Sequence, residues 1–149
     1  MMIRSTLAAL AFGLAAATAL ADEPADAYAD IEATLGRVPS MFAVFPKAGI
    51  AGAWSEFKSV QLNPETELDG KTKELLGLAV AAQIPCEYCV YFHTAAAKAN
   101  GATDGEIAEA VAMAAIVRHW STVLNGMAVD QATFRAEVDG ILAAAAPAN

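Results

Sequence analysis

Alanine-rich segments with apolar residues three or four positions apart constrain the fold of this chain most strongly. This spacing places the apolar residues on one face of a helix, whereas a half-buried strand needs strict alternation. Alanine is the best helix former, and runs of β-branched residues are few. We therefore predict an all-α domain of about six to seven helices.

Caps and breakers divide the chain into separate helices. Polar residues that accept backbone N–H bonds begin helices, and glycine or proline ends them. The predicted elements are a helix at about 26–35 ended by Gly36, a turn capped by Ser40, a helix at about 50–62, a helix capped by Asp69 that runs to about Gln83, a helix from Pro85 to about Asn100 stopped by Gly101, a long helix opened by the Thr103–Glu106 capping box and running to residue 123 or 124, and a last helix at about 130–145.

Apolar positions within these helices predict the core. Trp54, Phe57 and Val60 recur at helical spacing, so we interpret them as core residues rather than a cofactor box. The helix at 69–83 is apolar on more than one side, which predicts a central position. His119 is interpreted as a core histidine with its hydrogen bonds satisfied.

Residues 1–21 have the layout of a secretory signal peptide. Arg4 is followed by an apolar run from Leu7 to Leu20 and by a small-residue cleavage pattern that ends at Ala21. An uncleaved membrane anchor is the alternative, but the run is short and rich in alanine. We expect a domain at residues 22–149, exported to a bacterial periplasm and not held in a membrane, since no later apolar run approaches spanning length.

Charge narrows the range of partners. The whole chain has a formal net charge of −8, from 9 cationic and 17 acidic side chains. Removal of Arg4 with the signal peptide leaves 8 against 17, or −9. Such a surface repels phosphate backbones, so we expect no nucleic-acid partner.

Both cysteines lie in the stretch IPCEYCVYFH, residues 84–93. On a helix of about 100° per residue, Cys89 lies about 60° and His93 about 20° from Cys86, so the three share a stripe. Cys86 lies in the first predicted turn, where free backbone N–H groups favour a thiolate. His93 is one turn beyond Cys89 and can exchange a proton with it. The pattern indicates an activated dithiol.

Other interpretations of the cysteine pair fit less well. A structural zinc site needs four ligands, and only His93 and the distant His119 could add to the pair. Covalent haem attachment needs a histidine directly after the second cysteine, where this chain has Val90. A thioredoxin fold would place the pair after a strand. A structural disulfide between residues three positions apart adds little stability, because so short a loop constrains the unfolded chain only slightly. We therefore expect no metal and no cofactor.

The segment from Leu68 to Ala115 resembles the alkyl hydroperoxidase D (AhpD)-like branch of the carboxymuconolactone decarboxylase superfamily. The shared pattern is a glutamate, eleven intervening residues, CxxC, three residues and a histidine, then a small-residue helix ending in glycine. Glu74, Cys86, Cys89, His93 and Gly101 occupy these places. Upstream, the stretches RVPSMFAVFP and AWSEF are similar more loosely.

The resemblance implies a helical domain that assembles into trimers or hexamers, with a dithiol/disulfide active site. It implies that Cys89 attacks a hydroperoxide or a partner disulfide and that Cys86 resolves the product. Glu74 and His93 would relay protons, and an unidentified thiol reductant would restore the dithiol. A helix N-terminus alone would instead make Cys86 the more acidic thiol. Tyr88 stands where AhpD itself carries a histidine.

Three functions follow from these interpretations. The first is an exported thiol oxidoreductase with peroxidase-like, antioxidant activity. The second is a lyase of the carboxymuconolactone decarboxylase type, which does not depend on a cysteine pair. The third is a non-catalytic module whose CxxC is an oxidised surface clip.

Overall fold

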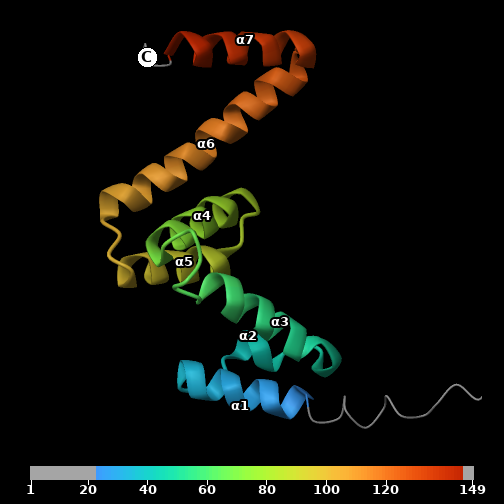
Figure 1. Cartoon of the computed structure of the whole chain (residues 1–149), viewed down its shortest axis with the longest axis vertical. Helices are drawn as coiled ribbons and strands as arrows, with labels where there is room; N and C mark the ends of the chain where they lie inside the picture. Colours follow the sequence, from blue (N-terminus) through green and yellow to red (C-terminus); the bar gives the residue numbers. More distant parts are fainter. Residues whose placement is uncertain (1–22, 146–149) are drawn as a thin grey trace, which may run out of the picture. The chain divides into compact units, whose positions relative to one another are not determined.

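The fold is all-helical, as the apolar spacing predicts. The computed structural model describes residues 23–145, and within them the chain forms seven α-helices, a 3-10 turn and a π-helical segment, with no strand (Figure 1). The described residues divide into two compact units, residues 23–65 and residues 66–145. The predicted signal peptide, residues 1–21, lies outside the described range.

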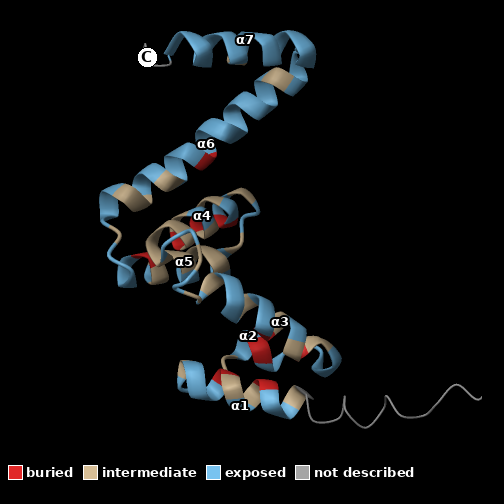
Figure 2. Ribbon diagram, viewed as in Figure 1, coloured by how far each residue is buried: buried red, intermediate tan, exposed pale blue. Residues whose placement is uncertain are grey.

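The first unit packs short helices around aromatic side chains. Its elements are α1 (Glu23–Leu35), α2 (Ser40–Ala43), the 3-10 turn η1 (Lys47–Gly49), α3 (Ile50–Glu56) and the π-helical segment η2 (Phe57–Gln61). Phe42 meets the rings of Trp54 and Phe57 edge-on, at centroid distances of 5.3 and 5.4 Å. These contacts surround a buried core of Ala27, Ile31, Phe42, Ile50 and Trp54, which appears red in Figure 2.

A polar cluster joins α1 to α3 and η2. The Trp54 indole donates to Oδ2 of Asp30 over 2.6 Å, and Nζ of Lys58 donates to both oxygens of the same carboxylate over 2.8 Å. The hydrogen bond from Lys58, and then that from Trp54, lower the pKa of Asp30. The cluster satisfies the one polar atom of the otherwise apolar Trp54 side chain.

Three expectations for this unit need correction. Ser40 is the first residue of α2 rather than its N-cap; Pro39 precedes the helix, and no side chain caps it. The helix predicted for residues 50–62 remains α-helical only to Glu56 and continues as the π-helical segment η2. This wider turn changes which side chains face inward, so Phe57 packs on the core while Val60 is 59% exposed.

The second unit is built around α4 (Gly70–Gln83). This helix packs against α5 (Glu87–Ala99) and against α6 (Asp104–Gly126), as its apolar residues on more than one side predict. Leu78, Ala81, Ala97 and Ala114 are buried where the three helices meet. Because three of these four side chains are alanines, the helix backbones can approach closely. A last helix, α7 (Gln131–Ala145), has no buried residue (Figure 2).

The predicted caps of α4 and α6 are confirmed. Asp69 accepts the backbone N–H of Thr72 over 2.7 Å, and Gly101 ends the α5 region with φ +83°. At α6, the Thr103 hydroxyl accepts the N–H of Glu106, and the Glu106 carboxylate accepts the N–H of Thr103. Lys71 of α4 also donates to Glu106 over 2.7 Å. These bonds lower the pKa of Glu106 to about 2, with the bond from Lys71 the largest cause.

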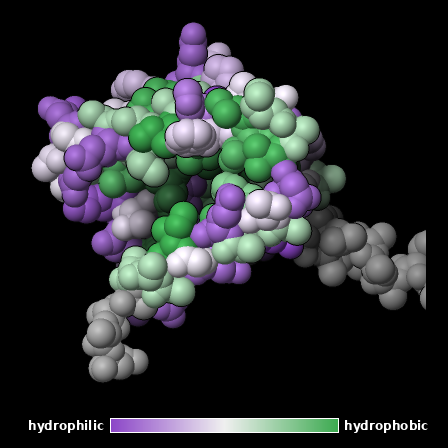
Figure 3. Space-filling model, turned by 90° about the horizontal axis from the view of Figure 1, so that it is seen from above, coloured by the Kyte–Doolittle hydropathy of each residue, from purple (hydrophilic) through white to green (hydrophobic). Residues whose placement is uncertain are grey.

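Helix α6 departs from two expectations. By length and composition its 23 residues could cross a membrane, and only 6% of its most apolar window is buried, so the expectation that no later run reaches spanning length is wrong. Several large side chains on α6 are exposed, among them Met113, Ile116, Val117 and Trp120. His119 is exposed beside Trp120, with ring centroids 5.2 Å apart, and is not a core histidine. The face of the molecule drawn in Figure 3 shows apolar patches between polar side chains.

Candidate active site

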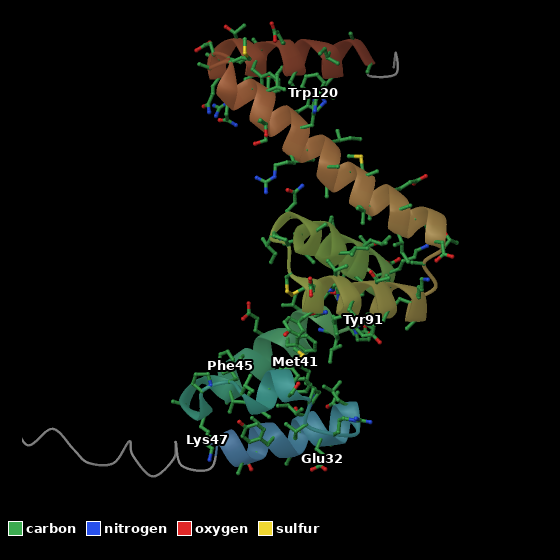
Figure 4. The ribbon with its side chains drawn as sticks, turned by 180° about the vertical axis from the view of Figure 1, so that it is seen from behind. Glu32, Met41, Phe45, Lys47, Tyr91 and Trp120 are labelled. Carbon is green, nitrogen blue, oxygen red and sulfur yellow. A yellow bond between two sulfur atoms is a disulfide. The ribbon has the colours of Figure 1, made fainter. Side chains whose placement is uncertain are left out.

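Cys86 and Cys89 form a disulfide at the start of α5, drawn in yellow in Figure 4. Their Cα atoms are 5.3 Å apart, within the range that disulfides require. Both residues are half-buried. The pair is therefore only partly covered by the rest of the unit.

Helix α5 begins at Glu87, two residues after the predicted start at Pro85. Cys86 is the N-cap of α5, with extended backbone angles of φ −95° and ψ 99°, and its sulfur accepts the N–H of Cys89 over 3.2 Å. The expectation that Cys86 belongs to the first turn is therefore wrong by one position. The extended cap is the adjustment that brings two residues three apart into bonding range. It also keeps the Cys86 sulfur beside the free N–H groups of the helix start, which favour a thiolate once the bond is reduced.

Glu74 and His93 meet between α4 and α5. Nδ1 of His93 lies 2.7 Å from Oε2 of Glu74, and the Glu74 side chain is only 5% exposed. With Glu74 ionised, Nδ1 is the protonated ring nitrogen, and Nε2 is then the nitrogen that accepts or releases a proton. His93 lies one turn after Cys89 on α5, so the sulfur and the imidazole project from the same stripe.

Gly77 explains how the imidazole fits against α4. A Cβ added at Gly77 would lie within 3.0 Å of Cε1, Nδ1 and Nε2 of His93. The ring therefore packs directly on the helix backbone, one turn after Glu74. Sequence reasoning did not select Gly77, although an isolated glycine inside a helical pattern is a signal for such a close approach.

An apolar pocket of about 680 Å³ lies along α5, on the side of the helix away from Cys89 and His93, and neither cysteine lines it. Pro85 and Glu87, the two chain neighbours of Cys86, belong to its wall, and Tyr91 projects from α5 with 79% of its surface exposed (Figure 4). The remaining lining residues are Ala82, Val90, Thr94, Ala95 and Lys98. Residues 23–145 hold no cluster of three or more His, Cys, Asp or Glu side chains that could bind a metal.

Comparison with known proteins identifies the class to which this fold and site belong. The Carboxymuconolactone decarboxylase family model matches residues 48–132, so the chain belongs to that family. Within it the chain is AhpD-like: it is 30% identical, with a TM-score of 0.64, to the crystal structure of the alkylhydroperoxidase AhpD core from Rhodospirillum rubrum. That likeness covers 80% of this chain and 92% of the other.

A curated relative matches over a shorter stretch. The chain is 41% identical over 51 residues to a Paracoccus denitrificans protein described as "Uncharacterized protein 4 in cox locus". The stretch makes up 34% of this chain and 46% of that protein. This chain therefore spans less than half the length of the curated relative it matches.

Proposed function

We propose that this chain is an exported thiol–disulfide oxidoreductase that uses Cys86 and Cys89 to reduce hydroperoxides or partner disulfides. The observation that carries the proposal is the placement of a bonded, half-buried CxxC pair one turn before a histidine that is paired with a buried glutamate. Accessible thiols at a helix N-terminus react as thiolates, and a carboxylate–imidazole pair moves protons.

In the proposed first step the Cys89 thiolate attacks the hydroperoxide. The sulfur bonds to the terminal peroxide oxygen, the O–O bond breaks, and the alkoxide leaves with the electron pair and takes a proton to become an alcohol. In the second step the Cys86 thiolate attacks the Cys89 sulfenic acid. The S–S bond forms, and hydroxide leaves and is protonated to water. One hydroperoxide and two thiols thus give one alcohol, one water and one disulfide.

His93 and Glu74 supply the protons in this scheme. Protonated His93 gives its Nε2 proton to the leaving oxygen, while the Glu74 carboxylate accepts Nδ1–H and holds the ring in place. A partner disulfide would react at the same sulfur by thiol–disulfide exchange. An external thiol reductant then returns the Cys86–Cys89 disulfide to the dithiol.

The signal-peptide pattern supports action in the periplasm, where the reductant must come from that compartment. The acidic balance of the chain speaks against nucleic acid as a partner.

Two measurements on the wild-type chain and its cysteine variants test the function. We expect the reduced chain to consume alkyl hydroperoxide or a partner disulfide, and Cys89→Ser to abolish this. Cys86→Ser should instead leave a sulfenic acid on Cys89 that a dimedone probe traps. Full activity in both serine variants would exclude the dithiol mechanism. The reduction potential of the pair should lie near the poise of the compartment, whereas a structural clip would lie far below it.

The family match also favours a second candidate, a lyase acting on a lactone acid. That chemistry does not need the cysteine pair. Alkylation of both thiols in the reduced chain separates the two candidates, because it should stop peroxide reduction and leave a lyase active.

A further inference from the structure

Gln83, the last residue of α4, is held by two residues of α6. Its side-chain N–H₂ donates to the carbonyl oxygen of Ala114, while its side-chain oxygen accepts Nε–H of Arg118 over 2.7 Å. Nη2 of Arg118 also donates to the backbone carbonyl of Gln83 over 3.2 Å. Arg118 thus donates hydrogen bonds to two oxygens of Gln83, and these bonds attach the C-terminal end of α4 to α6.

That end of α4 determines where Cys86 lies. The N–H of Ile84 donates to the carbonyl of Val80 over 3.1 Å, and the N–H of Cys86 donates to the carbonyl of Ala81 over 3.2 Å. The two residues between Gln83 and Cys86 therefore fold back on the last turn of α4. A movement of Gln83 would carry the backbone of Cys86 with it.

Arginine suits this position for two physical reasons. Its planar guanidinium presents several N–H groups in a fixed fork and can bind two oxygens at once, which the single ammonium of lysine cannot do with the same geometry. A cation at the C-terminal end of a helix also complements the partial negative charge of the last carbonyl groups. A second pocket, of about 540 Å³, includes Arg118 and Pro85 in its wall, so the guanidinium lies close to the turn that carries Cys86.

We propose that Arg118 is a positioning residue for the dithiol: through Gln83 it holds Cys86 at the distance from Cys89 that closes the disulfide. This inference rests on the proposed function and adds a residue that lies outside the CxxC, histidine and glutamate pattern. Loss of the hydrogen bonds between Arg118 and Gln83 lets the turn at residues 84–86 move, which makes disulfide closure less favourable. Attack of Cys89 on the substrate does not need these bonds and is affected less.

The test compares four full-length variants with the wild type: Arg118→Met, Arg118→Lys, Gln83→Leu and, as the control, Arg135→Met on α7. The equilibrium between dithiol and disulfide is measured against a thiol redox buffer, and dimedone labelling follows the sulfenic acid after one equivalent of alkyl hydroperoxide. We expect Arg118→Met and Gln83→Leu to lower the equilibrium constant for disulfide formation by about tenfold, a shift of about 30 mV toward less negative potential. Sulfenic acid should accumulate, since its resolution by Cys86 is slowed.

Arg118→Lys separates geometry from charge, because it keeps the cation and loses the fork. The proposal predicts that Arg118→Lys lowers the equilibrium constant for disulfide formation almost as much as Arg118→Met does. Arg135→Met should match the wild type. A wild-type equilibrium in Arg118→Met, or full retention in Arg118→Lys, would overturn the positioning role. A wild-type dithiol that reacts with neither hydroperoxide nor disulfide would instead overturn the proposed function. Circular dichroism and the unfolding midpoint verify that each variant folds.

Discussion

A carboxylate taken out of water is costly unless another group shares its charge or its proton. Glu74 is buried on α4, and Nδ1 of His93 lies 2.7 Å from its carboxylate. Burial of the Glu74 carboxylate therefore lowers the stability of the fold, and perturbed groups of this kind are common at functional sites. At the residue scale, the proton relay is the part of the site that a conservative substitution tests most cleanly.

Glu74→Gln should lower the rate at which hydroperoxide oxidises the reduced chain by about 100-fold, because removal of a general acid–base partner has effects of that order. The substitution keeps the side-chain shape and the capacity to accept a hydrogen bond. Stopped-flow measurement of the loss of thiols in a single turnover gives the rate. Glu109→Gln, at an exposed site on α6, is the matched control and should leave the rate unchanged. Equal rates for Glu74→Gln and wild type would remove Glu74 from the mechanism.

Gly77→Ala should destabilise the second unit by about 1 to 3 kcal/mol, the usual cost of forcing extra volume into a packed interior. The added methyl group would meet the His93 ring, so the rate of hydroperoxide reduction should fall as well. Denaturant unfolding and the single-turnover rate measure the two effects. Gly105→Ala is the control, since its Cβ would meet only the Thr103 hydroxyl, at 3.7 Å. A Gly77→Ala chain as stable as Gly105→Ala would contradict the close packing of His93 on α4.

The residues of the site differ in how far the sequence could predict them. Cys86, Cys89 and His93 follow from helical periodicity, because all three lie on one predicted helix. Glu74 does not, since periodicity cannot say which glutamate of one helix faces another helix; it came only from the family spacing. Gly77 was missed because its role depends on the packing between α4 and α5, which local sequence does not encode.

At the scale of the elements, α4 and α6 are joined at their starts by Lys71 and Glu106. The carboxylate of Glu106 accepts bonds from Lys71 and from the capping-box N–H of Thr103. A group whose pKa is lower in the folded state stabilises the fold only while it is ionised. Its contribution is therefore complete above the ordinary glutamate pKa, near 4.5, and is lost as the pH falls toward about 2.

Glu106→Gln should consequently lower the thermal unfolding midpoint at pH 6 to 7 and lose this difference from the wild type between about pH 4.5 and pH 2. Thermal melts of both chains across that range measure the effect. Glu109→Gln serves again as the control, and should track the wild type over the same interval. A Glu106→Gln deficit that stayed constant down to pH 2 would show that the carboxylate charge is not the cause.

The sequence predicted the helix boundaries best where a capping residue begins the helix. Asp69, Thr103 and Glu106 make short-range bonds that depend on a few neighbouring residues, and all three predictions are confirmed. The Ser40 cap failed because Pro39, already extended, precedes the helix and leaves Ser40 inside it. The π-helical segment η2 could not be predicted, since the apolar pattern of residues 50–62 fits a continuous α-helix equally well.

At the scale of the whole molecule, α6 and α7 leave much apolar surface uncovered among the described residues. Met113, Ile116, Val117 and Trp120 lie on one face of α6, at helical spacing, and are 48 to 61% exposed. Surfaces of this kind mark interaction sites. Together with the family resemblance they support the proposal that the chain assembles into a trimer or hexamer. The sequence predicted assembly only through that resemblance, because periodicity does not say what covers an apolar face.

Ile116→Glu with Trp120→Glu should weaken this assembly, because two carboxylates would have to be desolvated at the contact. Sedimentation velocity at micromolar concentration gives the size of the wild type and of the variant. Thr122→Glu, on another side of α6, is the control and should retain the wild-type size. A wild type that sediments as a monomer would contradict the proposed assembly and leave the apolar face of α6 for another partner.

The central claim is that Cys86 and Cys89 act as a reactive dithiol served by Glu74 and His93. Its most direct test is the rate and stoichiometry with which an alkyl hydroperoxide converts the reduced chain to the disulfide, followed by mass spectrometry together with the alcohol released. We expect one alcohol for each disulfide, formed about 100-fold faster than in the Glu74→Gln chain. Disulfide formation no faster than in the unfolded chain, or without a matching amount of alcohol, would contradict the claim.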